Sequence, residues 1–241
     1  RQMCIRDRPN DKTTFLICDD YSSLNSSSKN QKILDDFVAK NYNKIIITNN
    51  SLREKYQKAV FENNCISHFH FDYHDKEILN QKKKNQVCFV GALHSEKIDV
   101  ELIIDLLKKH PEMDFLFAGK IFNISIDKFS TFRNFKYLGE LNFKDATSLM
   151  CESKYGLIPF STNNYTNSVS SMKYFEYLAS LTIPICTKIP MYDSLPENLR
   201  PNLYLEDELD IKKFQIPDII EKRKYILNLS LIHISEPTRP I

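Results

Sequence analysis

The sequence predicts an α/β protein built on a doubly wound parallel sheet, and three observations lead to that prediction. Short apolar runs of strand length alternate with segments of helical periodicity. Several of the runs end in glycine or aspartate, where a buried strand meets its loop. The connections between them are short. We therefore expect helices flanking the sheet and ligand binding at the carboxyl ends of its strands.

The first third of the chain predicts a small α/β unit. Residues 14–18 and 44–48 are apolar runs that predict buried parallel strands. Apolar positions across 33–38 have helical spacing and predict a helix between the two strands. Ser51 is placed to cap a helix that begins at Leu52.

The rest of the chain shows the same alternation of strand and helix patterns. We expect strands at 87–90, 115–118, 135–138, 155–160, 183–186 and 203–205, and helices at 98–107, 144–151 and 172–179. Gly91, Gly119 and Gly139 follow the first three of these strands, where backbone must turn sharply or approach a ligand. The start of the helix at 172–179 offers free amides to a phosphate.

Composition excludes several classes of protein. The 241 residues carry a net charge of +2, which gives no broad basic face and predicts no nucleic-acid partner. No apolar stretch approaches the ~18 residues of a membrane-spanning helix. The six cysteines include no C-x-x-C pair, so we expect free, mostly buried thiols in a reducing compartment, the cytoplasm.

Both ends of the chain resemble translated sequencing-adapter read-through. Residues 1–8 and 229–241 are therefore expected to be non-native, and the part between them to be a fragment of a longer protein. Residues 76–86 are charged and polar, which predicts a linker. We expect one partial domain at 9–75 and a second domain at 87–228.

The most informative motifs lie between residues 155 and 186. Tyr155-Gly-Leu-Ile-Pro-Phe160 is followed by a polar loop, by Ser171-Met-Lys-Tyr-Phe-Glu-Tyr-Leu-Ala179 and by Ile183-Pro-Ile-Cys186. This series resembles the nucleotide-sugar site of GT-B glycosyltransferases, especially glycosyltransferase family 4. Further segments in the order of that family are Cys18-Asp-Asp-Tyr21, Ile47–Arg53, Val90-Gly-Ala-Leu93, Ile98–Ile103, His110–Gly119 and Phe135–Glu140.

The resemblance implies a GT-B architecture, in which residues 87–228 form the Rossmann-like nucleotide-sugar domain and 9–75 the end of the acceptor-side α/β domain. It implies transfer of a sugar, with retention and without a bound metal or other cofactor, from a nucleotide diphosphate sugar to a glycan or lipid-linked acceptor. Such a reaction belongs to glycan or polysaccharide biosynthesis. The catalytic residues of the early N-terminal domain would lie outside this chain.

The expected donor site gathers around the helix at 172–179. A carboxylate at Glu176 can accept both ribose hydroxyls, and the Lys173 ammonium, three residues earlier on the same face, can offset diphosphate charge. The alternative reading of this pair is an exposed Lys/Glu pair on an amphipathic helix. The full set of expected donor-binding residues is Glu176, Lys173, Ser170, Ser171, Gly91 and Gly139.

The sequence also departs from the family pattern. Eight positions before Glu176, where the family often carries a second acidic residue, this chain has Ser168. The loop after Gly91 lacks a clear basic residue for phosphate, and only His94 and Lys97 lie near it. These departures leave open a non-catalytic module that binds a nucleotide sugar.

A second motif suggests different chemistry. Alternation on a strand would place His68, His70, Asp72 and His74 on one face, which suits a zinc or iron site in a metal-dependent hydrolase. Interdomain packing is the other reading of this stretch. The basic run at 82–84 indicates a solvated linker or, alternatively, peripheral contact with the inner face of a membrane.

Overall fold

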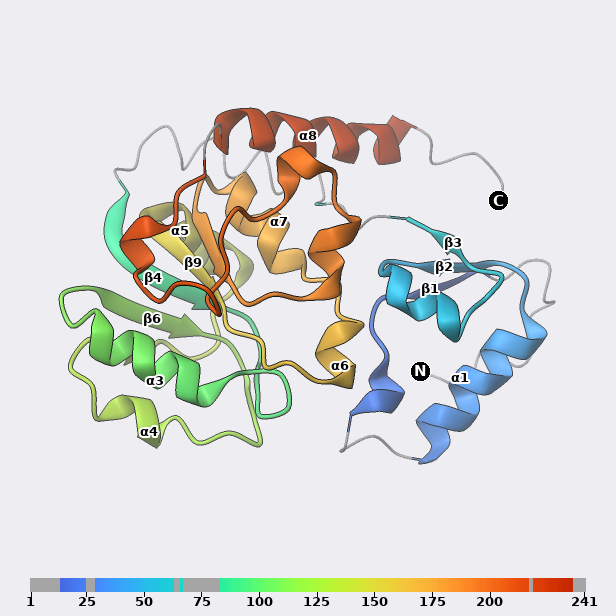
Figure 1. Ribbon diagram of the computed structural model, residues 1–241, viewed down its shortest axis with the longest axis horizontal. Coiled ribbons are helices and arrows are strands. Elements are labelled where there is room, and N and C mark those ends of the chain that lie inside the picture. The colour runs from blue at the N-terminus through green and yellow to red at the C-terminus, as the bar shows by residue number, and fades with distance from the viewer. Residues whose placement is uncertain (1–13, 25–28, 63–65, 67–82, 217–218, 236–241) are drawn as a thin grey trace.

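The computed structural model describes residues 14–24, 29–62, 66, 83–216 and 219–235, with side chains up to residue 228. These residues form two α/β units, a large one that contains β4 to β10 and a small one that contains β1 to β3 (Figure 1). The α/β class with parallel sheets that the sequence predicts is confirmed.

The large unit is built on a five-stranded, wholly parallel sheet in the order β10-β9-β4-β6-β8. Its strands are β4 (Lys84–Val90), β6 (Asp114–Ala118), β8 (Phe135–Tyr137), β9 (Ser153–Ile158) and β10 (Ile183–Cys186). A separate two-stranded pair joins β5 (Leu93–His94) to β7 (Ile121–Phe122).

Helices cover both faces of this sheet (Figure 1). Helices α3 (Val100–Lys109) and α4 (Asp127–Ser130) lie on one side, and α5 (Phe143–Glu152) and α7 (Met172–Ala179) lie on the other, with α8 (Ile219–Ser235) packed beyond α7. Short helices complete the unit: α6 (Asn164–Asn167), η5 (Pro190–Ser194), η6 (Glu197–Leu199) and η7 (Ile211–Lys213).

The strand order reverses once, between β4 and β9. From β4 the chain builds outward through β6 and β8, and then returns to the other side of β4 for β9 and β10. We call the region between the loops that follow β4 and β9, at the carboxyl edge of the sheet, the crevice. In a doubly wound fold this crevice is the expected place for a ligand.

The core of the large unit is aromatic. Phe117 stacks on Phe89 at 5.2 Å between ring centroids and meets Phe135 edge-on at the same distance. On the other side of the sheet the Tyr177 ring lies against Gly156, where an added Cβ would stand 2.5 Å from ring carbons. Gly156 is therefore required inside β9 because it leaves room for the Tyr177 ring.

The small unit has a three-stranded parallel sheet in the order β1-β2-β3. Its elements are β1 (Phe15–Ile17), η3 (Tyr21–Ser23), α1 (Lys29–Asn41), β2 (Ile45–Ile47), η4 (Asn50–Glu54) and β3 (Val60–Phe61). It has an apolar core of its own, centred on Val38, Ile45, Ile47, Leu52 and Tyr56.

Three local predictions are wrong. Ser51 is not the cap of the helix that follows, because Asn49 is its N-cap and accepts a hydrogen bond from the Ser51 N–H at 3.0 Å. Residues 203–205 form no strand, although the Leu205 N–H donates to the Cys186 carbonyl at the end of β10. Lys83 is not solvated, because its Nζ donates to the Ser180 carbonyl at 2.7 Å.

Other predictions can be compared with the described part of the chain. Its four cysteines are all free, and three of them are buried, as predicted. It contains no helix long and apolar enough to cross a membrane. The stretch His68, His70, Asp72 and His74 lies outside the described residues, and within them no cluster of three His, Cys, Asp or Glu side chains could hold a metal ion.

Candidate functional site

The crevice at the strand reversal brings together segments that are far apart in the sequence. Gly91 follows β4 directly, and Phe160 stands two residues beyond the end of β9. Helix α7 begins at Met172, after the polar loop that contains α6. The start of α7 therefore lies beside the backbone of the β4 loop, as its contact with Gly91 shows.

Lys173 makes that contact. A Cβ built on Gly91 would lie 2.3 Å from Lys173 Cε and 2.4 Å from its Nζ, and the glycine has a φ of +143°. The backbone conformation at this position therefore favours glycine, and a side chain here would displace the end of Lys173. Gly119 has φ +137° and packs against Gly91. A Cβ added to Gly119 would lie 2.0 Å from the Gly91 carbonyl oxygen.

A second lysine joins Lys173 in this crevice. Lys97 Nζ lies 4.8 Å from the centre of the Phe160 ring and 5.7 Å from that of Tyr165, while Lys173 Nζ lies 5.7 Å from the centre of Phe89. Within the described residues neither ammonium has a hydrogen bond or a direct ion pair. Two half-buried cations thus stand on aromatic faces without an anion in contact.

Burial is the main influence on the pKa values of both lysines. Burial and then the nearby Lys97 charge lower the pKa of Lys173 to about 8, against the opposing influence of Glu176 and Asp19. Burial also lowers the pKa of Lys97, which Asp19 partly offsets. A bound anion would relieve the repulsion between the two ammonium groups.

The predicted serines lie at the amino end of α7. Ser171 is its N-cap residue and is 4% exposed, and its Oγ has no hydrogen-bond partner among the described residues. Ser170 is also buried, and its N–H donates to Asp19 Oδ1 at 3.4 Å. The amides of the first turn of α7 and the unpartnered hydroxyl both favour a negatively charged ligand at this end.

The remaining two predicted residues lie farther from the lysine pair along the same edge. Glu176 is one turn into α7 and half-buried, and its charge reaches Lys173, although the described contacts include no ion pair between the two side chains. Gly139 follows β8, two strands away from β4, and its carbonyl accepts a hydrogen bond from the Gly119 N–H at 2.8 Å.

The small unit closes one side of the crevice through the loop before α7. The Asp20 N–H donates to Ser168 Oγ at 2.9 Å, and Tyr165 OH donates to Asp19 Oδ2 at 3.3 Å. Asn49 Nδ2 donates to the Val169 carbonyl at 3.1 Å. Ser168, which stands where the family resembled often has an acid, therefore serves as an interdomain hydrogen-bonding group.

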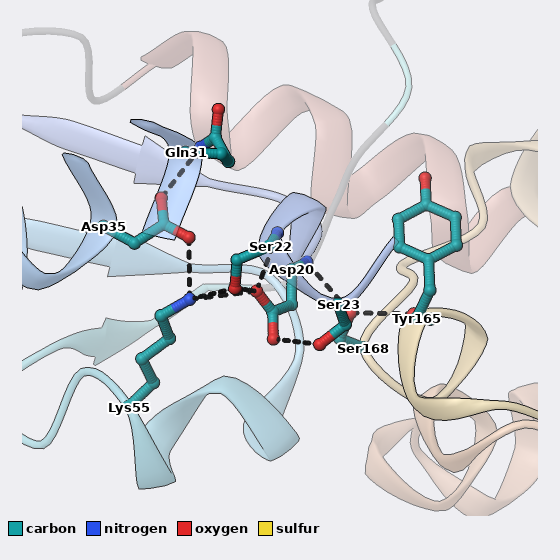
Figure 2. A network of polar contacts seen from close by, with 8 residues as sticks. All are labelled: Asp20, Ser22, Ser23, Gln31, Asp35, Lys55, Tyr165 and Ser168. Carbon is teal, nitrogen blue, oxygen red and sulfur yellow. Dashed lines mark hydrogen bonds and ion pairs between the residues drawn. The ribbon is translucent and has the colours of Figure 1, made fainter. Parts of the chain in front are cut away.

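A polar network within the small unit holds Asp20 in place (Figure 2). Lys55 Nζ lies 3.0 Å from Asp20 Oδ1 and 2.7 Å from Asp35 Oδ2, and it also donates to Ser22 Oγ. Burial raises the pKa of Asp20, but hydrogen bonds from Ser22, Ser23 and Lys55 outweigh it and leave that pKa below its ordinary value. The network thus fixes the end of β1 against the large unit.

Sequence reasoning missed two members of the site. Lys97 was noticed only as a residue near Gly91, and its closeness to Phe160, Tyr165 and Lys173 depends on the fold. Asp19 stands at the end of a predicted strand, but its contacts with Tyr165 and Ser170 span some 150 residues of sequence. A basic residue six positions after the strand-ending Gly91 was the one available signal for Lys97.

No protein-family model matches this sequence, and no curated protein matches it significantly. Solved structures do match its fold. HepE of Anabaena, in complex with UDP, superposes with a TM-score of 0.59 at 11% identity over 92% of this chain and 67% of its own. The sucrose-phosphate synthase of Thermosynechococcus elongatus gives 0.58 at 10% identity over 87% and 58%.

AviGT4, a glycosyltransferase involved in avilamycin A biosynthesis, gives a TM-score of 0.56 at 10% identity over 80% of this chain and 62% of its own. The chain thus spans between 58% and 67% of the length of these three structures. At this level of sequence identity the similarity concerns the fold and says nothing about substrates. In the order of its strands, the flanking helices and the second α/β unit, the chain has the GT-B fold of these glycosyltransferases.

Proposed function

We propose that this chain is part of a glycosyltransferase and that the crevice beside α7 binds the diphosphate of a nucleotide sugar. The observation that carries the proposal is the pair Lys97 and Lys173, two half-buried ammonium groups at the strand reversal that contact no anion in the described part of the chain. The amino end of α7 faces the same region. A diphosphate supplies the negative charge that all these groups favour.

The remaining groups suit the rest of a nucleotide sugar. Glu176, one turn along α7, is placed to accept hydrogen bonds from ribose hydroxyls. Two open polar pockets of about 340 and 360 Å³ share Asn164 and are lined largely by serine, asparagine and acidic side chains such as Ser161, Asn163 and Asp20. Such hydroxyl and amide groups suit a sugar, and HepE, a structure of the same fold, is in complex with UDP.

In this proposal the protein accelerates sugar transfer by stabilising the leaving group. When the bond between the sugar and the diphosphate breaks, negative charge grows on the diphosphate oxygens. Lys97, Lys173 and the α7 amides are already in place to stabilise that charge, so the chain supplies with fixed cations what a metal ion would otherwise supply. Retention at the sugar and a glycan or lipid-linked acceptor are the further expectations that the sequence carries.

Binding calorimetry tests the proposal with three probes: UDP, GDP and inorganic diphosphate. Lys97→Met and Lys173→Met should each weaken the binding of diphosphate by about tenfold or more, because each removes one charge-assisted contact. Glu176→Gln should weaken the binding of UDP or GDP relative to that of inorganic diphosphate, because the probe without ribose makes no hydrogen bond there.

The matched control is Lys154→Met. Lys154 is exposed, lies over the Tyr155 ring, and belongs to the amino end of β9, away from the crevice. Its replacement changes the net charge equally and should not change affinity. Equal affinity for diphosphate in the wild type and in both crevice-lysine variants would contradict the proposed function. Binding of nucleotide with no sugar transfer by a protein that includes the full acceptor domain would instead favour a binding module.

A further inference from the structure

The carboxylate of Asp19 reaches from the small unit into the anion site of the large one. It accepts a hydrogen bond from the Ser170 N–H at 3.4 Å and from Tyr165 OH at 3.3 Å, both in the segment that leads into α7. Its charge acts on both Lys97 and Lys173 and offsets part of the lowering of their pKa values by burial. The negative charge of Asp19 therefore acts on Lys97, on Lys173 and on the segment that leads into α7.

We propose that Asp19 is an internal substitute for the donor diphosphate, and that binding of a nucleotide diphosphate displaces its carboxylate from the α7 site. The proposal rests on the proposed function of this site. Both anions need the same groups: the Ser170 amide, the Tyr165 hydroxyl and the field of the two lysines. A carboxylate that stays in place would also repel the incoming diphosphate, because like charges in a half-buried crevice interact strongly.

The surrounding contacts decide which part of the protein responds. Asp19 lies directly after Cys18 at the end of β1, and its neighbour Asp20 is held by Lys55 and by Ser168. These contacts fix the backbone on either side, so the Asp19 side chain is the group that can turn away. Displacement of Asp19 also removes two of the hydrogen bonds that join the small unit to the loop before α7.

The hydrogen bonds of Asp19 are at the long end of those between the two units, where Asn49 Nδ2 also donates to the Asn167 carbonyl at 3.3 Å. The Asp20–Ser168 and Asn49–Val169 contacts measure 2.9 and 3.1 Å, whereas both contacts of Asp19 exceed 3.2 Å. No ion pair joins Asp19 to a lysine within the described part of the chain. A weakly held carboxylate near two cations suits a group that a more highly charged ligand replaces.

Calorimetry with inorganic diphosphate tests the proposal in the full chain. Asp19→Asn keeps the size and one hydrogen-bond acceptor of the side chain but removes its charge, so the variant should bind diphosphate about tenfold more tightly than wild type. Asp19→Ala should tighten binding as well. The control Asp36→Asn removes one negative charge from an exposed site on α1 of the same unit and should leave affinity unchanged.

Raising the ionic strength should reduce the gain in diphosphate affinity of Asp19→Asn, because the substitution removes an electrostatic repulsion that salt screens. Folding of each variant is verified by circular dichroism. Wild-type binding that Asp19→Asn leaves unchanged or weakens would overturn the displacement and leave the proposed function standing. Failure of both proteins to bind diphosphate would overturn the anion site itself together with the displacement.

Discussion

The Lys173 ammonium lies directly over Gly91, so close that an added Cβ at the glycine would stand 2.4 Å from Nζ. A contact this close joins the first turn of α7 to the loop after β4. The Lys173 ammonium thus lies against the Gly91 backbone and not against a carboxylate in the described part of the chain. Gly91 therefore does more than allow a turn, because the absence of its side chain creates the space in which the cation lies.

Replacing Gly91 tests this relationship. Gly91→Ala should move the Lys173 side chain, because its end cannot remain within 2.5 Å of a methyl group. We expect a loss of diphosphate affinity of about tenfold, together with about 1–2 kcal/mol of destabilisation from the positive φ. Calorimetry gives the first quantity and chemical unfolding gives the second.

The matched control is Gly139→Ala. Gly139 also has a positive φ, +75°, but nothing lies within 4 Å of its Cβ position. Gly139→Ala should therefore add backbone strain without moving a neighbouring side chain. It should keep its affinity for inorganic diphosphate if this glycine, two strands away from β4, lies outside the diphosphate site. If both variants lost affinity equally, the loss would come from strain in the loops, and the steric account of Lys173 would be wrong.

The pH dependence of diphosphate binding should follow Lys173. Its pKa is lowered to about 8, first by burial and then by Lys97. Below that pH the ammonium is charged and attracts the anion; above it the neutral amine does not. Affinity should therefore fall as the pH rises from 7 to 9.5, and binding near pH 8.5 should take up protons because the anion raises the pKa.

Calorimetry at one pH in buffers of different ionisation enthalpy measures that proton uptake. Lys173→Arg supplies the comparison, since a guanidinium stays charged throughout this range. Its binding should be flatter between pH 7 and 9.5, whatever its absolute affinity. A pH dependence that is the same in the wild type and in Lys173→Arg would exclude Lys173 as a titrating contact of the anion, because diphosphate itself titrates in this range and affects both proteins alike.

Much of the framework could be predicted from the sequence, and the reason is local. Helix α7 covers the residues 172–179 that its apolar spacing predicts, and strand β10 likewise covers 183–186. Strong periodicity and flanking turn residues are contained within a few positions, so they need no knowledge of the fold. The fold also brings Lys173 against Gly91, while the donor-binding role of the expected residues stays a prediction.

What could not be predicted depends on partners distant in sequence. Lys83 belongs to a basic run, yet it is half-buried and donates to the Met150 and Ser180 carbonyls near the ends of α5 and α7, where burial lowers its pKa to about 8. Charge runs are usually solvated, and nothing near residue 83 indicates that two helix ends converge on it. The role of Asp19 was hidden for the same reason.

The contact of Tyr177 with Gly156 offers a test of packing in the large unit. Gly156→Ala places a methyl group 2.5 Å from atoms of the Tyr177 ring, which is fully buried. We expect destabilisation of about 2–3 kcal/mol from the forced shift. Tyr177→Leu should cost stability alone, but in the double variant it should relieve part of the Gly156→Ala penalty; strictly additive losses would contradict the steric cause.

The Lys55 network should make the small unit sensitive to acid. Lys55→Met leaves Asp20 and Asp35 together without their cation, in surroundings where their side chains are only 19% and 11% exposed. At pH 7 we expect the free energy of unfolding to fall by about 1–3 kcal/mol, less than for a fully buried pair because water still reaches the site. Lys58→Met, at an exposed position of the same segment, should cost almost nothing.

The loss should shrink in acid, and the sign follows from Asp20. Its pKa in the folded wild type lies below its ordinary value, so its ionised form stabilises the fold above pH 4, and that stabilisation disappears as the pH falls through the lowered pKa. Removal of Lys55 raises the pKa of Asp20, so the variant loses less folding free energy than the wild type when the pH falls. Urea unfolding followed by circular dichroism at pH 7 and pH 3 should show the gap between wild type and Lys55→Met narrowing. A gap that stays constant or widens would mean that Lys55 stabilises the small unit by packing and not by its charge.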